Sequence, residues 1–236
     1  MKAKLNQKLI NLIEYYNLIN ADIIFKNIPI DRSTKLKTLN LEGSKLEKLN
    51  KLKNLIKSVK NCELKESANN MVFADGNIQS KIMIVGEGPG AQEDKVGLPF
   101  VGRAGQLLDK MLAAINLNRK NVYITNVVNY RPPSNRKPND EEIFRYLPYL
   151  SSHIETINPK ILLLLGSTAL NTIIGDEEVI SNARGKWFQK DIGKIKPWVI
   201  ASFHPAFLMR QPDKKKLSWV DLKMIKAKIN QINLSN

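Results

Sequence analysis

The feature that most constrains the fold is a regular alternation of short apolar runs with longer amphipathic segments, which begins at residue 81. The apolar runs predict strands at residues 82–85, 122–124, 161–165 and 198–201. Helical spacing of apolar residues predicts helices at residues 104–115, 140–157 and 216–232, and a short helix after Gly166. Apolar strands that alternate with helices indicate a parallel sheet covered on both faces. We therefore expect an α/β fold, a three-layer α/β/α sandwich around a central four-stranded, mainly parallel sheet.

The segment before this alternation has a different pattern. Apolar residues recur at helical spacing over residues 4–19 and 44–58, with a break around residues 28–33. We expect residues 1–65 to form a basic α-helical extension and residues 66–236 to form the α/β domain. The Lys-rich face of the extension fits a solvated surface better than a dedicated contact to DNA.

The formal net charge of the 236-residue chain is +15, which is typical of nucleic-acid binding but also follows from a composition rich in Lys, Asn and Ile. The net charge is +7 over residues 1–70, +3 over residues 71–209 and +5 over residues 210–236. The excess therefore lies at the two ends of the chain, and the charge alone does not decide between the two interpretations.

Composition excludes several classes of protein. One Cys rules out a disulfide framework and a Cys-rich zinc site within the chain. No apolar run reaches the length of about 18 residues that predicts a membrane-spanning helix. The first residues lack the long apolar stretch and the small-residue cleavage site of a signal peptide, so we expect a cytoplasmic protein. A monomer is the expected oligomeric state.

Polar and glycine residues concentrate in the loops that follow the predicted strands. The first strand is followed by Gly86-Glu87-Gly88-Pro89-Gly90, the second by Asn126 and the fourth by His204-Pro205. Because the carboxyl ends of parallel strands share one edge of a sheet, we expect a carboxylate, an amide and an imidazole to meet there.

Each of these signals is weak alone. The glycine turn lacks both the spacing of a dinucleotide-binding loop and the Lys-Ser/Thr of a P-loop. This disfavours the alternative of an α/β enzyme that acts on small molecules and binds a nucleotide at this turn. Asn126 on its own fits a residue that caps a turn, and His204 a histidine of the core. The combination of the three loops is more specific than any one of them.

Several motifs occur in one order between about residues 72 and 222. They are Gly86–Gly90 with Glu93-Asp94, the run from Gly97 to Gly105, Thr125-Asn126-Val127-Val128, the run from Arg131 to Arg136, and His204-Pro205-Ala206. Together they resemble the motifs of the type 4 uracil-DNA glycosylases. The resemblance implies a three-layer α/β/α fold and hydrolysis of the N-glycosidic bond of uracil in DNA, a step of base-excision repair.

The resemblance also assigns uracil contacts to Gly86, Glu87, Gly88, Phe100, Asn126 and His204. Uracil has to leave the base stack to be cut. Phe100 would then stack on the flipped ring, and Asn126 would read the base edge through its carbonyl and its amide. His204 would donate to uracil O2, where negative charge develops.

Two carboxylates carry roles that the sequence leaves open. Glu87 would either orient the attacking water or offset the positive charge of the oxocarbenium-like sugar. Glu93 is a supporting residue, which would either orient His204 or help to exclude the methyl group of thymine.

Contacts to DNA are expected from the same edge of the sheet. Arg131, Arg136, Lys137, Arg184, Lys186, Arg210 and Lys214–Lys216 are candidates for phosphate contacts. Phe207, Leu208 and Met209 form an apolar loop that would fill the gap left by the flipped base, with Leu208 as the candidate wedge. A loop packed under the last helix is the alternative for Phe207.

The chain departs from the family at one place. The resemblance implies an iron–sulfur cluster held by four cysteines, and the matching positions here are Cys62, Lys65, Tyr130 and Tyr146. A cluster of this kind needs thiolate ligands, and one Cys does not supply them. We expect no cofactor, no metal, and two tyrosines that fill the vacated volume.

Two functions remain in competition. The first is a monofunctional uracil-DNA glycosylase. The second is a protein of the same fold that binds uracil or DNA but has lost much of its catalysis together with the cluster.

Overall fold

The computed structural model describes residues 36–175 and 178–234. These residues belong to one compact unit. The helix expected at residues 4–19 lies outside the described residues.

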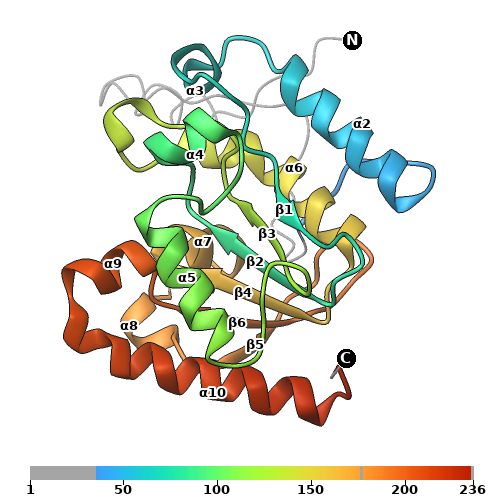
Figure 1. The fold of residues 1–236 in the computed structure, drawn as a ribbon. Helices are drawn as coiled ribbons and strands as arrows, with labels where there is room; N and C mark the ends of the chain where they lie inside the picture. The colour runs from blue at the N-terminus through green and yellow to red at the C-terminus, as the bar shows by residue number, and fades with distance from the viewer. Residues whose placement is uncertain (1–35, 176–177, 235–236) are drawn as a thin grey trace, which may run out of the picture. The chain divides into compact units, whose positions relative to one another are not determined.

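A single mixed sheet forms the centre of the unit (Figure 1). Its four central strands are β2 (Ile82–Gly86), β3 (Tyr123–Asn126), β4 (Ile161–Leu165) and β6 (Trp198–Ser202). They are mutually parallel in the order β3-β2-β4-β6. The predicted parallel sheet is thus confirmed.

The sheet has two more strands than the four expected. The short strands β1 (Asp75–Gly76) and β5 (Trp187–Gln189) pair antiparallel with β3 and β6, at the two edges of the sheet. Neither is a continuous apolar run, which is the pattern that marks the buried central strands.

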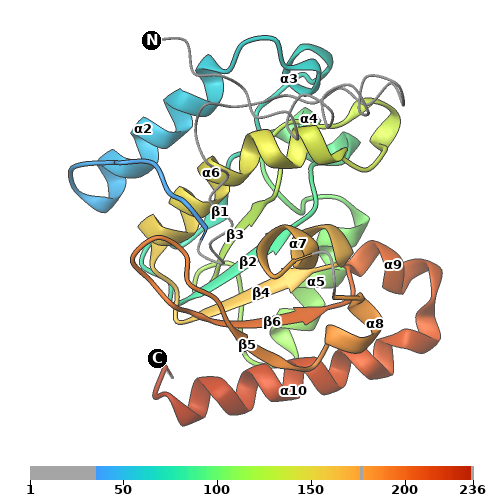
Figure 2. The same cartoon turned by 180° about the vertical axis from the view of Figure 1, so that it is seen from behind.

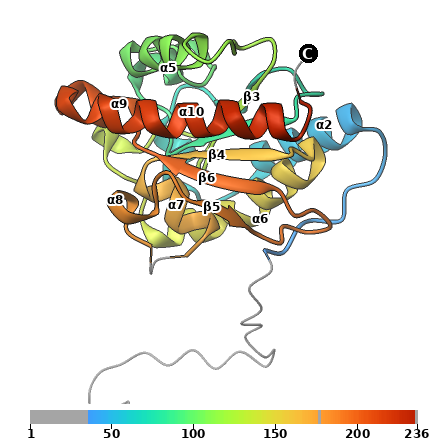
Figure 3. The same ribbon diagram turned by 90° about the horizontal axis from the view of Figure 1, so that it is seen from below.

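Helices cover both faces of the sheet. On one face lie α2 (Lys45–Ser58), α3 (Glu63–Ser67), α6 (Asp140–Ile157), α7 (Ser167–Ile173) and α8 (Ile180–Ala183). On the other lie α5 (Arg103–Ala113), α9 (Pro205–Arg210) and α10 (Lys215–Gln231). Short turns of helix also occur as α4 (Ala91–Val96), η1 (Pro133–Asn135) and η2 (Pro212–Lys214). Figures 2 and 3 show the sheet between α6 and α7 on one side and α5 and α10 on the other.

The alternation of side chains along the strands explains these layers. On β2, Met83 and Val85 pack into the core beneath α6, whereas Ile82 and Ile84 pack into the core beneath α5 and α10. Both faces are apolar because successive side chains of a strand point to opposite faces and both faces are covered. The expected three-layer sandwich is therefore confirmed.

Helix α2 does not belong to a separate extension. Its residues Leu49, Leu52 and Ile56 are buried in the same core as Leu150 and Ile154 of α6. The boundary expected between residues 65 and 66 therefore falls inside the compact unit. Among residues 36–175 and 178–234, none of the helices has the length and hydropathy of a membrane span.

Candidate functional site

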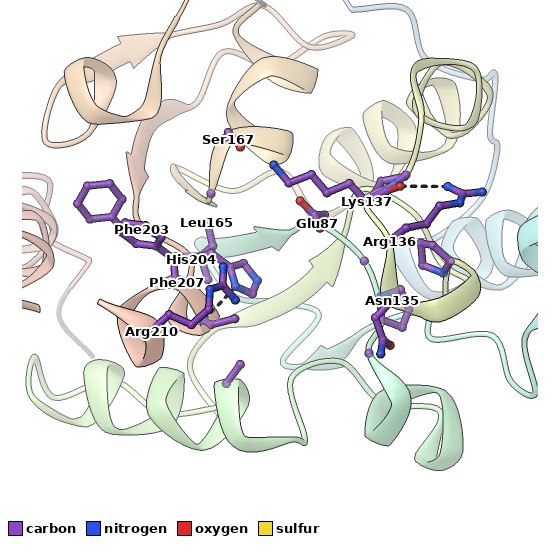
Figure 4. Close-up of a pocket in the computed structure, with 18 of the residues that line it drawn as sticks. Glu87, Asn135, Arg136, Lys137, Leu165, Ser167, Phe203, His204, Phe207 and Arg210 are labelled. Carbon is purple, nitrogen blue, oxygen red and sulfur yellow. Dashed lines mark hydrogen bonds between the residues drawn. The ribbon is translucent and has the colours of Figure 1, made fainter. Parts of the chain in front are cut away.

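The four parallel strands end together at one edge of the sheet, which we call the carboxyl edge. Gly86 of β2 is in register with Asn126 of β3, and Leu165 of β4 with Ser202 of β6. The loops that leave this edge carry Glu87, His204 and the start of α7, and all three border one cavity of about 440 Å³ (Figure 4). Glu87 and His204 thus line the cavity, whereas the Asn126 amide lies at the same edge, at the end of β3, without lining it.

Gly86 permits a close approach of two side chains in the site. A Cβ atom at this position would lie 2.5 Å from Asn126 Oδ1 and 2.5 Å from Phe100 Cζ. Both separations are shorter than any real contact of a Cβ atom, so every other residue would displace the amide or the ring. The missing side chain lets Phe100 and Asn126 converge at the end of β2.

The Asn126 side chain is poised for a ligand. It is only 3% exposed, and no group in residues 36–175 and 178–234 donates a hydrogen bond to its Oδ1. A buried amide oxygen without a donor costs about 1–3 kcal/mol, so such atoms are rare without a function. This oxygen is a ready acceptor for an N–H group that enters the site.

Phe100 is held in an unusual backbone conformation. Its φ angle is +54°, a left-handed value that is uncommon for a bulky residue. Arg119 donates to the carbonyl oxygens of Phe100 and, at 3.0 Å, of Pro99. A Cβ atom at Gly105 would collide with the Phe100 carbonyl, so α5 packs directly against it. No sequence signal indicated the Arg119 contact, because Arg119 follows Phe100 by 19 positions and lies outside every motif.

His204 is set up as a neutral donor. Its Nδ1 accepts from the backbone N–H of Ala206 at 3.2 Å, which leaves the proton on Nε2. Burial lowers the pKa of His204 to about 4; the Arg210 charge adds to this shift, and the Glu93 charge opposes it. The ring centre lies 5.6 Å from that of Phe100. At neutral pH the imidazole can therefore donate from Nε2 into the site without carrying a charge.

The two carboxylates have different environments. Glu87 is half-buried at the cavity, and one of its oxygens accepts from the Thr168 hydroxyl of α7. Glu93 accepts from the backbone N–H of Gly90 at 3.2 Å and of Gly102 at 2.8 Å. Glu93 thus ties together the two glycine loops, and within the described residues it acts on His204 through its charge and not through a hydrogen bond.

The family model of the uracil DNA glycosylase superfamily matches residues 73–225. The chain belongs to the uracil-DNA glycosylase superfamily. It is 41% identical over 168 residues to the type-4 uracil-DNA glycosylase of Pyrobaculum aerophilum, covering 70% of this chain and 86% of the relative. It is 43% identical over 156 residues to that of Thermotoga maritima, covering 66% and 80%. The type-4 enzyme of Archaeoglobus fulgidus is 39% identical over 184 residues, covering 76% and 92%. The expected resemblance is confirmed.

Since members of this superfamily act on DNA, the cations around the cavity differ in how available their charges are to DNA. Arg136 is not fully available, because its guanidinium binds both carboxylate oxygens of Glu142 at 2.8 and 2.7 Å. Arg131 donates to Asn135 Oδ1 at 2.8 Å. Lys137 and Arg210 border the cavity, and their charged side-chain groups have no hydrogen-bond or ion-pair partner in the described part of the chain. In Figure 4 the Lys137 side chain extends past Glu87, and Arg210 lies at the lower left, beyond His204.

Two of the expected DNA contacts are corrected. Arg184 donates through Nε to the buried Asp221 at 3.1 Å and is held by it in an internal ion pair, so its charge is compensated inside the fold. Leu208 is 1% exposed in the core beneath α9, so it does not act as a wedge. The segment that was expected to be a loop is helical. Lys186 is exposed, but it does not line the cavity.

Of the four positions that match the cysteine ligands of the type-4 resemblance, three share one buried cluster (Cys62, Tyr130 and Tyr146), and Lys65 follows Cys62 on α3; we call the four the Cys62 corner. Cys62 Sγ lies 3.5 Å from Tyr146 Oη, and burial raises the pKa of both tyrosines. Lys65 Nζ donates to the carbonyls of Lys57 at 2.6 Å and of Val59 at 3.1 Å. A thiol, two phenols and an ammonium group do not fit an iron–sulfur cluster, which needs thiolates. In the described residues no group of three or more His, Cys, Asp or Glu side chains could hold a metal ion.

Proposed function

We propose that this chain excises uracil from DNA by hydrolysing its N-glycosidic bond, leaving an abasic site as a step of base-excision repair. The observation that carries the proposal is the buried, unpartnered Asn126 Oδ1, which lies beside Phe100 at the end of β2. Relatives in the superfamily are named as type-4 uracil-DNA glycosylases, which supports the same activity.

Recognition follows from the hydrogen-bonding pattern of the base. The target nucleotide leaves the stack and enters the site, where the Phe100 ring offers a face for stacking. Asn126 Oδ1 accepts from uracil N3–H, and its amide donates to O4. Cytosine presents the opposite pattern at these two atoms, so its binding leaves buried polar groups unpaired, which discriminates strongly.

The bond is broken by stabilising the leaving base and assisting the attack of water. The electron pair of the N-glycosidic bond leaves with uracil N1 and spreads onto O2. His204 Nε2–H donates to O2 as this negative charge develops, and a neutral imidazole suits the task because Ala206 fixes its tautomer. The water oxygen bonds to C1′ and its proton is released. Glu87 serves this step in one of two ways, by orienting the water or by offsetting the positive charge of the sugar.

Lys137 and Arg210 contact the phosphates that flank the flipped nucleotide. Both border the cavity, and no carboxylate of the described residues neutralises them. Arg131, Arg136 and Lys186 remain weaker candidates. Phe207 lines the cavity and packs on Phe203 with ring centres 4.9 Å apart, so Phe207, and not the buried Leu208, contributes the apolar surface of α9 near the gap. Binding should weaken steeply with salt.

The enzyme works without an iron–sulfur cluster. The residues of the carboxyl edge are the ones that contact the base and the sugar, and the Cys62 corner offers one thiol where the cluster would need four. Two expectations of the sequence stay predictions: a cytoplasmic location, which suits a single buried Cys, and a monomeric state.

The decisive experiment incubates the protein with an oligonucleotide that carries one uracil and then treats it with alkali, which cleaves the strand at an abasic site. We expect cleavage at the uracil position and none in a matched oligonucleotide with cytosine or thymine. An intact uracil strand together with retained DNA binding would favour the competing function, a binding protein of the same fold.

A further inference from the structure

Glu87 is flanked by two glycines, which do not restrict the direction of its carboxylate. It lies between Gly86 and Gly88 at the end of β2, and neither neighbour has a side chain to restrict it. The carboxylate is half-buried at the cavity. Its direction must therefore be fixed by a group from another part of the chain.

Thr168 supplies this group. Its hydroxyl donates to Glu87 Oε2 across 81 positions of sequence. Within residues 36–175 and 178–234, no second hydrogen bond reaches the Glu87 carboxylate. Thr168 therefore occupies one carboxylate oxygen and leaves Oε1 free for the substrate or for water.

Helix α7, which carries Thr168, is itself firmly placed. The turn before it depends on Gly166, which has a φ of +93° and whose N–H donates to the carbonyl of Ser202 at 2.9 Å. A Cβ atom at Gly166 would lie 3.1 Å from His204 Cβ, so the start of α7 packs against the His204 loop. Ala169, Leu170 and Ile173 then bury the other side of α7 in the core. The Thr168 hydroxyl is thus presented from a rigid element.

We propose that Thr168 is a positioning residue for uracil excision, which holds Glu87 Oε2 so that Oε1 faces the reacting sugar. This inference rests on the proposed function, since it assigns the working oxygen of a group in that reaction. A hydrogen bond from a hydroxyl to a carboxylate is strong enough to fix the direction of the carboxylate. Thr168 does not contact the substrate in this proposal and acts only through Glu87.

The test is a double-mutant cycle between Thr168→Val and Glu87→Gln. Valine keeps the shape of threonine and removes the donor. We expect Thr168→Val to lower the single-turnover rate of uracil excision about 10- to 100-fold, with DNA affinity unchanged. Thr168→Ser should restore most of the rate. In a Glu87→Gln background, Thr168→Val should cost nothing further. Equal losses for Ser and Val, or a full second loss in the Glu87→Gln background, would overturn the proposal.

Thr172→Val is the matched control. Thr172 lies one turn further along α7, and its hydroxyl donates to the Thr168 carbonyl at 2.7 Å without touching Glu87. Its excision rate should stay at the wild-type value. Crystal structures give a readout that does not require activity: the Glu87 carboxylate should rotate in Thr168→Val and stay in place in Thr168→Ser. A carboxylate unmoved in Thr168→Val refutes the inference even if the wild-type protein proves inactive, and inactivity of the wild type by itself counts only against the proposed function.

Discussion

The carboxyl edge and the Cys62 corner differ in what they keep of the type-4 pattern. At the carboxyl edge, Glu87, Phe100, Asn126 and His204 all match the resemblance, and no group of the described residues donates to the buried Asn126 Oδ1. At the Cys62 corner three of four matching positions have changed, and the side chains present contact one another or a backbone carbonyl. The difference separates the residues that we propose to contact the base from the residues that pack between the helices.

The largest expected effect belongs to the carboxyl edge. His204→Ala removes the Nε2–H donor to uracil O2, and we expect the single-turnover excision rate to fall about 10²- to 10³-fold, the usual cost of losing one donor to a developing anion. Phe144→Ala is the control, since Phe144 is 72% exposed on α6. If His204→Ala excised uracil as fast as this control, the charge at O2 would be stabilised by another group.

The second effect concerns recognition of the base. Asn126→Asp replaces the amide donor to O4 by an acceptor, and we expect the preference for uracil over cytosine to fall on the order of 10- to 100-fold. Competition between the two oligonucleotides measures it. Asn129→Asp is the matched control, because the Asn129 amide donates instead to the Val72 carbonyl at 3.1 Å. It should lower stability and leave the preference intact; unchanged selectivity in Asn126→Asp would remove Asn126 from recognition.

The contrast between the two regions also explains what the sequence could predict. The buried strands β2, β3, β4 and β6 carry long apolar runs, and strand-end loops must meet at one edge, so the sheet and the shared edge of Glu87, Asn126 and His204 followed from the pattern. Phe100 was named only through the family resemblance. The edge strands β1 and β5 are too short to produce a pattern. Helix α9 has six residues, too few for periodicity to reveal that Leu208 points into the core.

Contacts between distant segments were the main omission. Arg119 holds the Phe100 carbonyl, and Thr168 holds Glu87, yet neither residue stands in a motif. Both depend on how a helix or loop is placed after the sheet has formed. The prediction of a DNA contact for Arg184 was wrong for the opposite reason. Arg184 lies near a motif, but its charge is paired with the buried Asp221, and the sequence does not reveal that ion pair.

The third effect is on stability and compares the two histidines of the chain. Burial lowers the pKa of His153 from 6.5 to about 3, and its ring bonds to Tyr123 Oη at 2.9 Å. Between pH 6.5 and pH 4, His153 and His204 are protonated in the unfolded chain but stay neutral in the folded chain. The free energy of unfolding therefore falls as the pH falls. Each histidine contributes a slope of up to about 1.4 kcal/mol per pH unit. Urea titrations at several pH values measure it. His153→Gln should reduce this slope, and an unchanged slope would show that His153 is protonated in the fold.

The smallest effect is expected at the Cys62 corner. Tyr146→Phe removes only a 3.5 Å contact to a thiol, a weak partner, so the free energy of unfolding should fall by about 1 kcal/mol or less. Tyr123→Phe is the comparison at a stronger hydrogen bond, the one to His153, and should lower the free energy of unfolding by more.

Treatment with an iron chelator should change neither the melting temperature nor the excision rate, because the chain has no set of thiolates that could hold iron. Stoichiometric iron in the purified protein, or loss of excision on chelation, would show that the corner still holds a metal and would erase the contrast with the carboxyl edge.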